Sequence, residues 1–416
     1  MIVRLPYGRG ELDADLPDHT VVVESIYTPG ILDEAEALLF ALNNPIGSPS
    51  LSELVPAGAR VGISVCDITR PFPARRVLPL LISCLPSAEI TIFVATGTHR
   101  ACTDVELEEM LGRDIQKACR VLQHDAFDYG QHAEVGRLSD TGTPAMLQSD
   151  FIEQDVRITT GFIEPHFFAG FSGGPKMVAP GLGSIETVLD LHSATRIGHP
   201  QAKWGVIEGN PVHDAIREVA KMADITFNLD VTLNRNREIT GVFAGELFAS
   251  HAAGCAFARS TAMIAVDRMY DVVVTSNNGY PLDQNLYQSI KGISAAAQIV
   301  RQGGAIVIAA ECSDGMPNHG QYRALLNDAR GPIEFLTRVA QPDFASHDQW
   351  QVQVQAEIQR KARVYVRAEG VREAELRSAW FEPVDDIGRL VRQLGGSVAV
   401  IPDGPMTIPY LSKSRS

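Results

Sequence analysis

A repeated order of strand, polar loop and helix is the feature of this chain that most constrains its fold. In the first half, the apolar, β-branched runs VGISV, EITIFVA and VRITTG each end in a polar loop, and helices are predicted at residues 31–44 and 74–85. A strand buried on both faces reads as a continuous apolar run, and helical crossovers join parallel neighbours. The pattern therefore predicts an α/β protein built on a mainly parallel sheet.

The same order returns in the last third of the chain. The runs DVVVTS, AIVIAA, RVYVR and SVAVI each lead into a polar loop, with helices predicted at residues 286–301, 331–339, 351–360 and 387–394. A chain of 416 residues is also long enough for two or more domains. We therefore predict two domains, residues 1–262 and 263–416, each with a mainly parallel sheet flanked by helices.

Charge and composition disfavour several classes of protein. The formal net charge is −14 at pH 7, which argues against a nucleic-acid partner and against binding to an anionic membrane surface. No apolar run approaches the ~18 residues of a membrane-spanning helix, and the N-terminus lacks a signal-peptide pattern. The 6 cysteines are scattered without C-x-x-C spacing, which argues against a zinc ribbon or a disulfide framework. We therefore expect a cytoplasmic protein.

Candidate functional residues follow the predicted strands of the first domain. The loop DITRP starts at Asp67 and contains Arg70, the loop GTHR contains His99 and Arg100, and the loop after VRITTG contains His166. An arginine can bind a phosphate or carboxylate through two N–H groups. Taken singly, a capping Asp67 with an exposed Arg70 explains the first loop about as well as a binding role does, and a structural role is the better explanation of His99. Ligands of parallel sheets bind beyond the carboxyl ends of the strands, so three polar loops there favour a binding site.

A glycine-rich segment surrounds one lysine. Lys176 stands in GFSGGPK, and a second glycine-rich turn, PGLGS, follows it. Glycine lets the backbone approach a ligand closely and adopt positive φ. A phosphate-binding P-loop needs Gly before the lysine and Ser or Thr after it, whereas Pro175 and Met177 stand there. A phosphate-loop transferase is therefore disfavoured, and no G-x-G-x-x-G motif signals a free dinucleotide.

Two histidines follow this segment, His192 and His199. A metal shared by both requires one helix to continue through two turns, and Gly198 and Pro200 predict that it ends earlier. One ligand and one bystander is the favoured interpretation. In the second domain, Gln288 and Lys291 are three residues apart and share a helix face, for which solvent exposure is the default explanation. Core packing is the default role of Trp350.

Taken together, these motifs resemble the nickel-dependent lactate racemase family. The resemblance rests on the ordered set DITRP, GTHR, EPHFFAGFSGGPK, LDLHSATRIGHP and YQSIK, which runs through both predicted domains. Each motif is weak alone, whereas the set in this order, with one lysine between two histidines, is highly specific. The resemblance implies a two-domain α/β fold with the active site in the cleft between the domains.

The resemblance also implies a cofactor, the nickel-pincer nucleotide. This group is a Ni(II)-pyridinium-3,5-bisthiocarboxylate mononucleotide, supplied by cofactor-biosynthesis enzymes. Lys176 would hold it covalently, and His192 would be the protein ligand to nickel. The positions matching the loop around the nucleotide are Asp67, Ile68, Thr69 and Arg70. Sulfur and imidazole donors suit Ni(II).

The activity implied by the resemblance is racemisation of a 2-hydroxy acid such as lactate. Hydride and proton leave the substrate to give a 2-keto acid and return to its other face. His99 and His166 match the paired bases, while Arg70, Gln288 and Lys291 match residues that hold the substrate carboxylate. An imidazole titrates near neutral pH, which suits a group that must both take and give a proton.

Two sets of alternatives stay open. The same chemistry could act on malate, on a longer or aromatic 2-hydroxy acid, or on a sugar acid, because a scaffold does not determine its substrate. A non-catalytic nucleotide-binding protein is the alternative outside enzymes. Such a protein would have no need of both His99 and His166.

Overall fold

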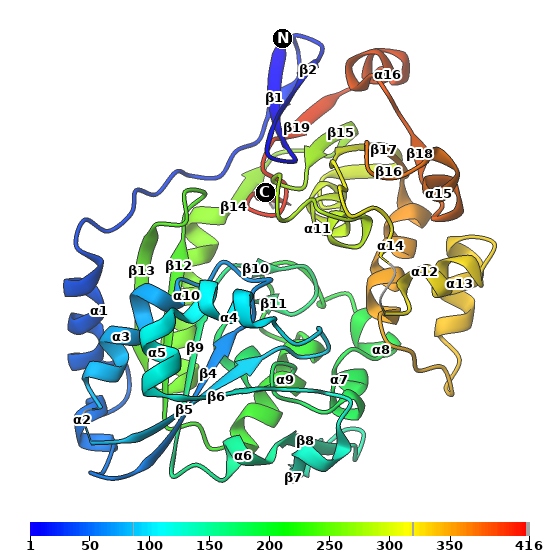
Figure 1. Ribbon diagram of the computed structural model, residues 1–416. Coiled ribbons are helices and arrows are strands. Elements are labelled where there is room, and N and C mark those ends of the chain that lie inside the picture. Colours follow the sequence, from blue (N-terminus) through cyan, green and yellow to red (C-terminus); the bar gives the residue numbers. More distant parts are fainter. Residues whose placement is uncertain (86, 318–319, 413–416) are drawn as a thin grey trace. The chain divides into compact units, whose positions relative to one another are not determined.

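The computed structural model spans residues 1–416, and the structure describes all of them except residues 86, 318–319 and 413–416 (Figure 1). The chain forms two compact units, each discontinuous in sequence. The central unit comprises Tyr27–His192 and Gly205–Ser260. The terminal unit comprises Met1–Ile26, Ser193–Trp204 and Thr261–Ser416.

The sheet of the central unit has six strands in the order β13-β12-β9-β4-β5-β6. The strands are β4 (Arg60–Cys66), β5 (Glu89–Ala95), β6 (Arg120–Gln123), β9 (Val156–Phe162), β12 (Phe227–Leu233) and β13 (Ile239–Gly245). All neighbours are parallel except β12 and β13, which are antiparallel. Four two-stranded sheets, three antiparallel and one parallel, complete the described strands of the chain, and the central unit holds two of the antiparallel ones, β7 (His132–Arg137) with β8 (Pro144–Gln148) and β10 (Pro165–His166) with β11 (Gly170–Phe171).

The two faces of this sheet pack against different parts of the unit. Val61, Ile63 and Val65 of β4 join one core with the helices α1 (Glu34–Asn43) and α3 (Ala74–Ser83). From the alternate positions of β4, the Ser64 hydroxyl donates to the Met177 carbonyl at 2.9 Å. This alternation follows the period of two along a strand. It fixes the segment around Lys176 to the sheet.

The central unit contains further helices. They are α2 (Leu51–Leu54), α4 (Asp104–Leu111), α5 (Arg113–Ala118), α6 (Ser149–Ile152), α7 (Ile185–Leu191), α9 (Pro211–Met222) and α10 (Leu247–Ala262), with 3-10 turns η1 (Tyr129–Gln131) and η2 (Gly174–Met177). Helix α9 has Pro at its start and Asn210 as N-cap, whose side chain accepts N–H groups of the first turn.

The terminal unit has a second six-stranded sheet, with the order β18-β17-β16-β15-β19-β3, and every neighbouring pair in it is parallel. Its strands are β3 (Val21–Val22), β15 (Tyr270–Ser276), β16 (Val300–Ala309), β17 (Arg363–Arg367), β18 (Glu382–Pro383) and β19 (Val398–Ile401). The smaller pairs are β1 (Ile2–Tyr7) with β2 (Gly10–Asp15) and β14 (Met263–Val266) with β20 (Ile408–Leu411). The helices are α8 (Ala194–Ile197), α11 (Leu286–Ala297), α12 (Tyr322–Asn327), α13 (Pro332–Val339), α14 (Gln349–Lys361), α15 (Glu373–Ser378) and α16 (Ile387–Leu394).

The predicted fold class is confirmed, and two details differ. The helix predicted at 286–301 ends at Ala297, because Val300 already pairs with Tyr270 of β15 as strand. The units also differ from the predicted continuous domains, 1–262 and 263–416. The first residues join the terminal unit because β3 pairs with β19.

Residues 193–204 belong to the terminal unit for a different reason, since side chains of that unit hold the segment at both ends. The Trp204 indole donates to the Ser294 hydroxyl at 3.0 Å, and the Gln353 amide donates to the Ala194 carbonyl at 2.9 Å. None of the described helices combines the length and the apolar composition needed to cross a membrane.

Candidate active site

Three neighbouring strands of the central sheet bring the candidate loops to one edge. The order β9-β4-β5 is parallel, so the loops after Phe162, Cys66 and Ala95 leave the same edge of the sheet. His99 and the DITRP loop were predicted to lie there, and the structure brings them into direct contact. This edge is where open α/β sheets bind ligands.

Asp67 and His99 form the closest polar contact at this edge. The Asp67 carboxylate accepts from His99 Nδ1 at 2.7 Å, and Asp67 is buried while the His99 side chain is 38% exposed. A carboxylate can only accept, so Nδ1 carries the proton and Nε2 of a neutral His99 carries a lone pair. His99 is thereby oriented as a base.

Hydrogen bonds hold Asp67 for this contact. Its other oxygen, Oδ1, accepts from the Thr69 hydroxyl at 2.6 Å and from the Thr69 N–H at 3.2 Å. Burial alone would raise the pKa of Asp67, but His99 and Arg70, together with the hydrogen bonds, outweigh it and lower the pKa below its ordinary value. The carboxylate is therefore ionised at neutral pH.

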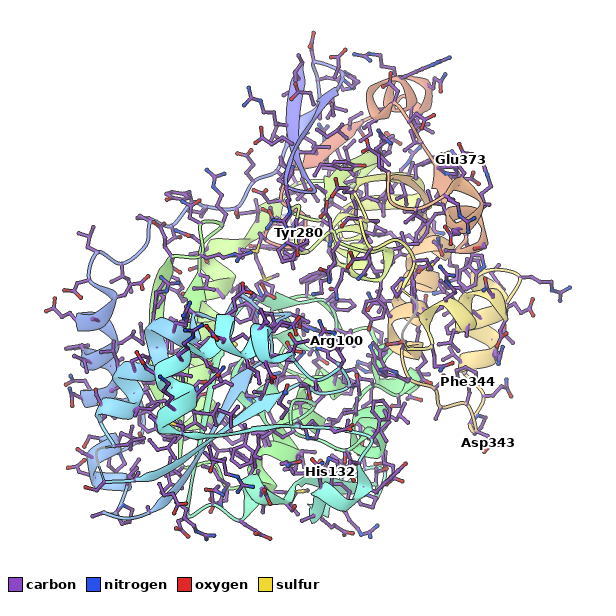
Figure 2. All side chains as sticks on the ribbon, viewed as in Figure 1. Arg100, His132, Tyr280, Asp343, Phe344 and Glu373 are labelled. Atoms are coloured by element: carbon purple, nitrogen blue, oxygen red, sulfur yellow. The ribbon has the colours of Figure 1, made fainter. Side chains whose placement is uncertain are left out.

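The other side chains of the DITRP and GTHR loops make contacts of three kinds. Arg70 Nη1 donates to the Thr69 hydroxyl at 3.1 Å, which keeps the guanidinium beside Asp67. Ile68 is half-buried and packs against the central core, so its side chain supports the loop. Arg100, labelled in Figure 2, pairs with Glu106 of α4 at 2.6 Å. Arg100 therefore anchors a helix start.

His166 lies on the small strand β10 and has the opposite proton arrangement. Its Nδ1 accepts from the Ala169 N–H at 3.2 Å. A backbone N–H can only donate, so the proton of a neutral His166 is on Nε2. The two histidines predicted as bases thus differ in the described structure: His99 presents a lone pair at Nε2, and His166 presents an N–H.

The ring of Phe168 joins three of the predicted residues. Its centroid lies 4.5 Å from that of His166 and 5.2 Å from that of His192, both edge to face. Lys176 Nζ lies 5.7 Å from the same ring centroid. His166, Lys176 and His192 therefore surround one buried aromatic side chain, although they are far apart in sequence.

Lys176 is presented by the 3-10 turn η2, which glycines make possible. Gly173 and Gly174 have φ of 75° and 47°, values that residues with a Cβ atom rarely adopt. The Gly174 N–H donates to the buried Asp230 carboxylate at 2.9 Å. This hydrogen bond therefore fixes the first residue of η2, and the backbone that carries Lys176 is held in one conformation.

His192 is the C-cap of α7 and is buried. Its Nδ1 lies 2.8 Å from the carbonyl oxygen of Val188, one turn earlier in the helix. A carbonyl accepts, so Nδ1 donates and Nε2 carries the lone pair. Fixing one ring nitrogen of a histidine in this way leaves the other as a metal ligand, as in many metal sites.

Comparison with known proteins assigns the family. Residues 7–205 match the lactate racemase N-terminal domain, and residues 266–408 match the lactate racemase C-terminal domain. The chain belongs to the lactate racemase family. It is 33% identical to the lactate racemase of Thermoanaerobacterium thermosaccharolyticum over 422 residues, which covers 98% of each chain. It is 36% identical to that of Lactiplantibacillus plantarum over 367 residues, 86% of each chain.

Solved structures agree with this assignment. The lactate racemase apoprotein from Thermoanaerobacterium thermosaccharolyticum has a TM-score of 0.93 to this chain at 33% identity and covers 98% of this chain and 100% of that one. A protein from Thermotoga maritima shares the fold at 19% identity, with a TM-score of 0.70 over 93% of this chain. The chain is accordingly a lactate racemase-like isomerase.

The remaining candidates of this lactate racemase family member lie in the terminal unit. Gln288 and Lys291 are half-buried in the first turns of α11, whose N-cap, Asn285, accepts the Gln288 N–H at 3.0 Å. Their predicted role in binding the substrate carboxylate stays a prediction. His199 is exposed in a local turn outside α7, and Trp350 is buried with its ring 5.5 Å from that of His347.

Sequence reasoning missed two features of the site. It placed Asp67 in the nucleotide loop, and the structure adds a direct bond from Asp67 to His99. It also overlooked Phe168, because a phenylalanine in an apolar stretch has core packing as its default role. The DITRP and GTHR loops follow two consecutive predicted strands, and this was the available signal for the contact between Asp67 and His99.

Proposed function

We propose that this chain racemises or epimerises a 2-hydroxy acid, with lactate or a related acid as substrate. The observation that carries the proposal is the packing of His166, His192 and Lys176 around Phe168. In a family of racemases, this packing brings together a candidate acid–base group, His166, a candidate metal ligand, His192, and a candidate point of cofactor attachment, Lys176.

The residues fit the nickel-pincer nucleotide that the family implies. His192 has Nδ1 committed to the Val188 carbonyl, which suits Nε2 for nickel, and Gly173 and Gly174 leave the start of the turn, before Pro175 and Lys176, without side chains. Lys176 would hold the group covalently, His192 would ligate Ni(II), and Asp67, Ile68, Thr69 and Arg70 would form the surrounding loop. When bound, the cofactor supplies a hydride acceptor. Cofactor-biosynthesis enzymes would provide it.

The chain's own part in the reaction is proton transfer and substrate orientation. Nε2 of His99 would take the hydroxyl proton of one enantiomer, and the Asp67 carboxylate would stabilise the resulting imidazolium. His166, with a proton at Nε2, would return a proton to the substrate oxygen when the opposite enantiomer forms. Removal of the hydroxyl proton by one histidine and delivery by the other balances the protons, and inversion at the α-carbon needs the hydride acceptor that the cofactor would supply when bound.

Substrate orientation is assigned to three cationic or amide side chains. Arg70, Gln288 and Lys291 would hold the carboxylate while the α-carbon changes hybridisation. Malate, longer or aromatic 2-hydroxy acids and sugar acids remain the alternative substrates, because no described side chain distinguishes their R groups.

The reducing cytosol is the compartment that we propose. All 6 cysteines are free, and 5 of these thiols are classed as buried, namely Cys66, Cys102, Cys119, Cys255 and Cys312. Free thiols of this kind are usual in proteins kept under reducing conditions.

The proposal is tested by making the protein together with cofactor-biosynthesis enzymes. The intact mass should rise by one cofactor, the gain should map to Lys176, and nickel should copurify. Each enantiomer of lactate, malate and a longer 2-hydroxy acid should then be followed by chiral chromatography. Lys176→Ala should abolish both the mass gain and racemisation. An active enzyme without modification at Lys176 would contradict the proposal.

A further inference from the structure

Asp230 is a fully buried carboxylate that faces the segment carrying Lys176. It lies on β12 at 0% exposure, and its Oδ2 accepts the Gly174 N–H at 2.9 Å and the Asn228 amide at 3.0 Å. Burial raises its pKa to about 6, against the two hydrogen bonds, which lower it. A buried carboxylate is costly unless its oxygens accept strong hydrogen bonds, so its presence here calls for a function.

A chain of hydrogen bonds fixes the orientation of Asp230. The Asn228 amide also donates to the Ser250 hydroxyl at 2.9 Å, and its oxygen accepts from the Thr159 hydroxyl at 2.8 Å. The Asp230 carboxylate can only accept, so the NH₂ group of Asn228 faces it and the amide oxygen faces the Thr159 hydroxyl on β9. Oδ2 of Asp230 therefore accepts from two donors, the Asn228 amide and the Gly174 N–H.

The glycines of the Lys176 segment are needed at this carboxylate. A Cβ at Gly173 would lie 3.0 Å from Asp230 Oδ1, and a Cβ at Gly161 would lie 2.9 Å from the same atom. Real Cβ atoms essentially never show a contact under 3.0 Å, and a contact of 3.0 Å is tighter than most of them. The backbone of β9 and that of the turn therefore both approach Asp230 closely.

A second buried side chain holds the same backbone from α10. His251 Nε2 donates to the Ser172 carbonyl at 2.9 Å, and a Cβ at Gly174 would lie 2.6 Å from its ring. Ser172 and Gly174 are thus bound by His251 and by Asp230, two residues before the turn reaches Lys176. Two separate elements, β12 and α10, converge on this short stretch.

We propose that Asp230 is a positioning residue for Lys176, which holds the Gly173–Gly174 turn in its bent form before the cofactor is attached. The inference rests on the proposed function for the consequence of this placement, because Lys176 is the proposed point of attachment. The bond to Gly174 fixes the first residue of η2, and Lys176 is the third. Without it, two glycines could adopt many other conformations and carry the lysine away from Phe168.

The test compares Asp230→Ala, the conservative variant Asp230→Asn, and Thr232→Val as control. Asp230→Ala removes the acceptor of both hydrogen bonds, whereas in Asp230→Asn the amide oxygen can take the place of Oδ2 and accept from both the Gly174 N–H and the Asn228 amide. Thr232 lies on the same face of β12, but its hydroxyl bonds to Thr240 at 2.8 Å and not to the Lys176 segment.

The first measurement is hydrogen exchange of the full-length protein made without the cofactor pathway. We expect the peptide containing Gly174 to exchange ~10–100-fold faster in Asp230→Ala, the range for a lost hydrogen bond to a charged group. Asp230→Asn should retain most of the protection, and Thr232→Val should keep it. Unchanged exchange in Asp230→Ala would overturn the proposal.

The second measurement is the mass gain at Lys176 in protein made with the cofactor pathway. Asp230→Ala should be modified much less than wild type, with recovery in Asp230→Asn. Equal modification in wild type and Asp230→Ala would overturn the positioning role. If the wild type itself is not modified, the proposed function fails, and the exchange result still decides whether Asp230 holds the turn.

Discussion

The Asp67 carboxylate accepts a hydrogen bond from His99 Nδ1 at 2.7 Å, and this contact determines which nitrogen of His99 can act as a base. The Thr69 N–H and hydroxyl occupy the other carboxylate oxygen. Both oxygens of Asp67 are therefore committed, and the arrangement of donors around them defines a single tautomer of His99.

Asp67→Asn should reverse that tautomer. The Thr69 N–H can only donate, so the oxygen of the new amide must stay beside it, and the NH₂ group then faces His99 Nδ1. Nδ1 becomes an acceptor, the proton moves to Nε2, and the base is lost. We expect kcat to fall ~10²–10⁴-fold. Steady-state racemisation of purified holoenzyme measures this loss.

Thr69→Val is the matched comparison for that prediction. It removes one hydroxyl donor to Asp67 but keeps the backbone N–H and the Asp67–His99 bond. We expect a smaller loss than in Asp67→Asn, because the Asp67–His99 bond that sets the tautomer is kept. If Asp67→Asn and Thr69→Val lose the same activity, the tautomer argument is wrong.

His99→Ala and His166→Ala should each nearly abolish racemisation in both directions, because a full cycle needs one proton removed and one delivered. A half-reaction can survive. With stoichiometric holoenzyme and one enantiomer, single-turnover mixing that follows cofactor absorbance should reveal opposite enantiomer preferences in the two variants. Loss of the same enantiomer in both, or wild-type racemisation in either, would remove the paired-base assignment.

His192→Ala should lose nickel, while His199→Ala should retain most of it. His192 is buried with Nδ1 bonded to Val188, whereas His199 is exposed in a separate turn. Of these two histidines, His192 is the one whose Nε2 is oriented beside Phe168. Metal content of the holoenzyme, measured by elemental analysis after gel filtration, tests this. The reverse order of nickel loss would mean that the wrong histidine was chosen.

Lys291→Ala should raise KM for the 2-hydroxy acid sharply, because a carboxylate without its cation is costly to remove from water. Lys291→Arg should retain part of the affinity, since the charge is kept. KM and kcat are measured for both enantiomers. Wild-type kinetics in Lys291→Ala would exclude Lys291 from substrate binding.

The sequence was sufficient for the fold class and for the edge of the sheet that carries the candidates. Buried runs such as VGISV predict parallel strands, and residues after such strands share one edge, which is why Asp67 and His99 could be expected near each other. The sequence did not predict that the segment from Ser193 to Trp204 packs with the terminal unit. That segment belongs to the terminal unit through Trp204 and Gln353, contacts between residues far apart in the chain.

Proton positions were also beyond sequence reasoning. His99 and His166 are the same residue type after similar strands, yet one Nδ1 donates to a carboxylate and the other accepts from a backbone N–H. Those partners depend on the local path of the chain, which no residue pattern specifies. The same holds for Asp230, which reads as an ordinary polar residue in a strand until its contact with Gly174 is known.

Buried histidines should make the protein sensitive to acid. Burial lowers the pKa of His124 and His251 to about 4 and that of His213 to about 3. An unfolded histidine titrates near 6.5, so between about 4 and 6.5 the unfolded chain binds more protons at these sites. These histidines therefore lower the free energy of unfolding progressively as the pH falls from about 6.5 toward 4, and they have no such effect above about pH 6.5.

Asp230 acts in the opposite direction over part of this range. Its pKa is raised to about 6, so between about 4 and 6 the folded chain binds more protons there than the unfolded chain does. Three histidines oppose one carboxylate, so the net free energy of unfolding should still fall with acidification. Urea denaturation between pH 4.5 and 7, followed by tryptophan fluorescence, should give steadily lower midpoints at lower pH. Midpoints that rise on acidification would contradict the prediction.

Variants separate the two contributions. His124→Gln removes one histidine whose Nε2 lies 3.0 Å from the Gly183 carbonyl, so the dependence of the urea midpoint on pH should become shallower. Asp230→Asn removes the opposing carboxylate, so the dependence should become steeper. His199→Gln changes an exposed histidine and should leave it as in wild type. A shallower dependence in Asp230→Asn would mean that its carboxyl group does not take up a proton on folding.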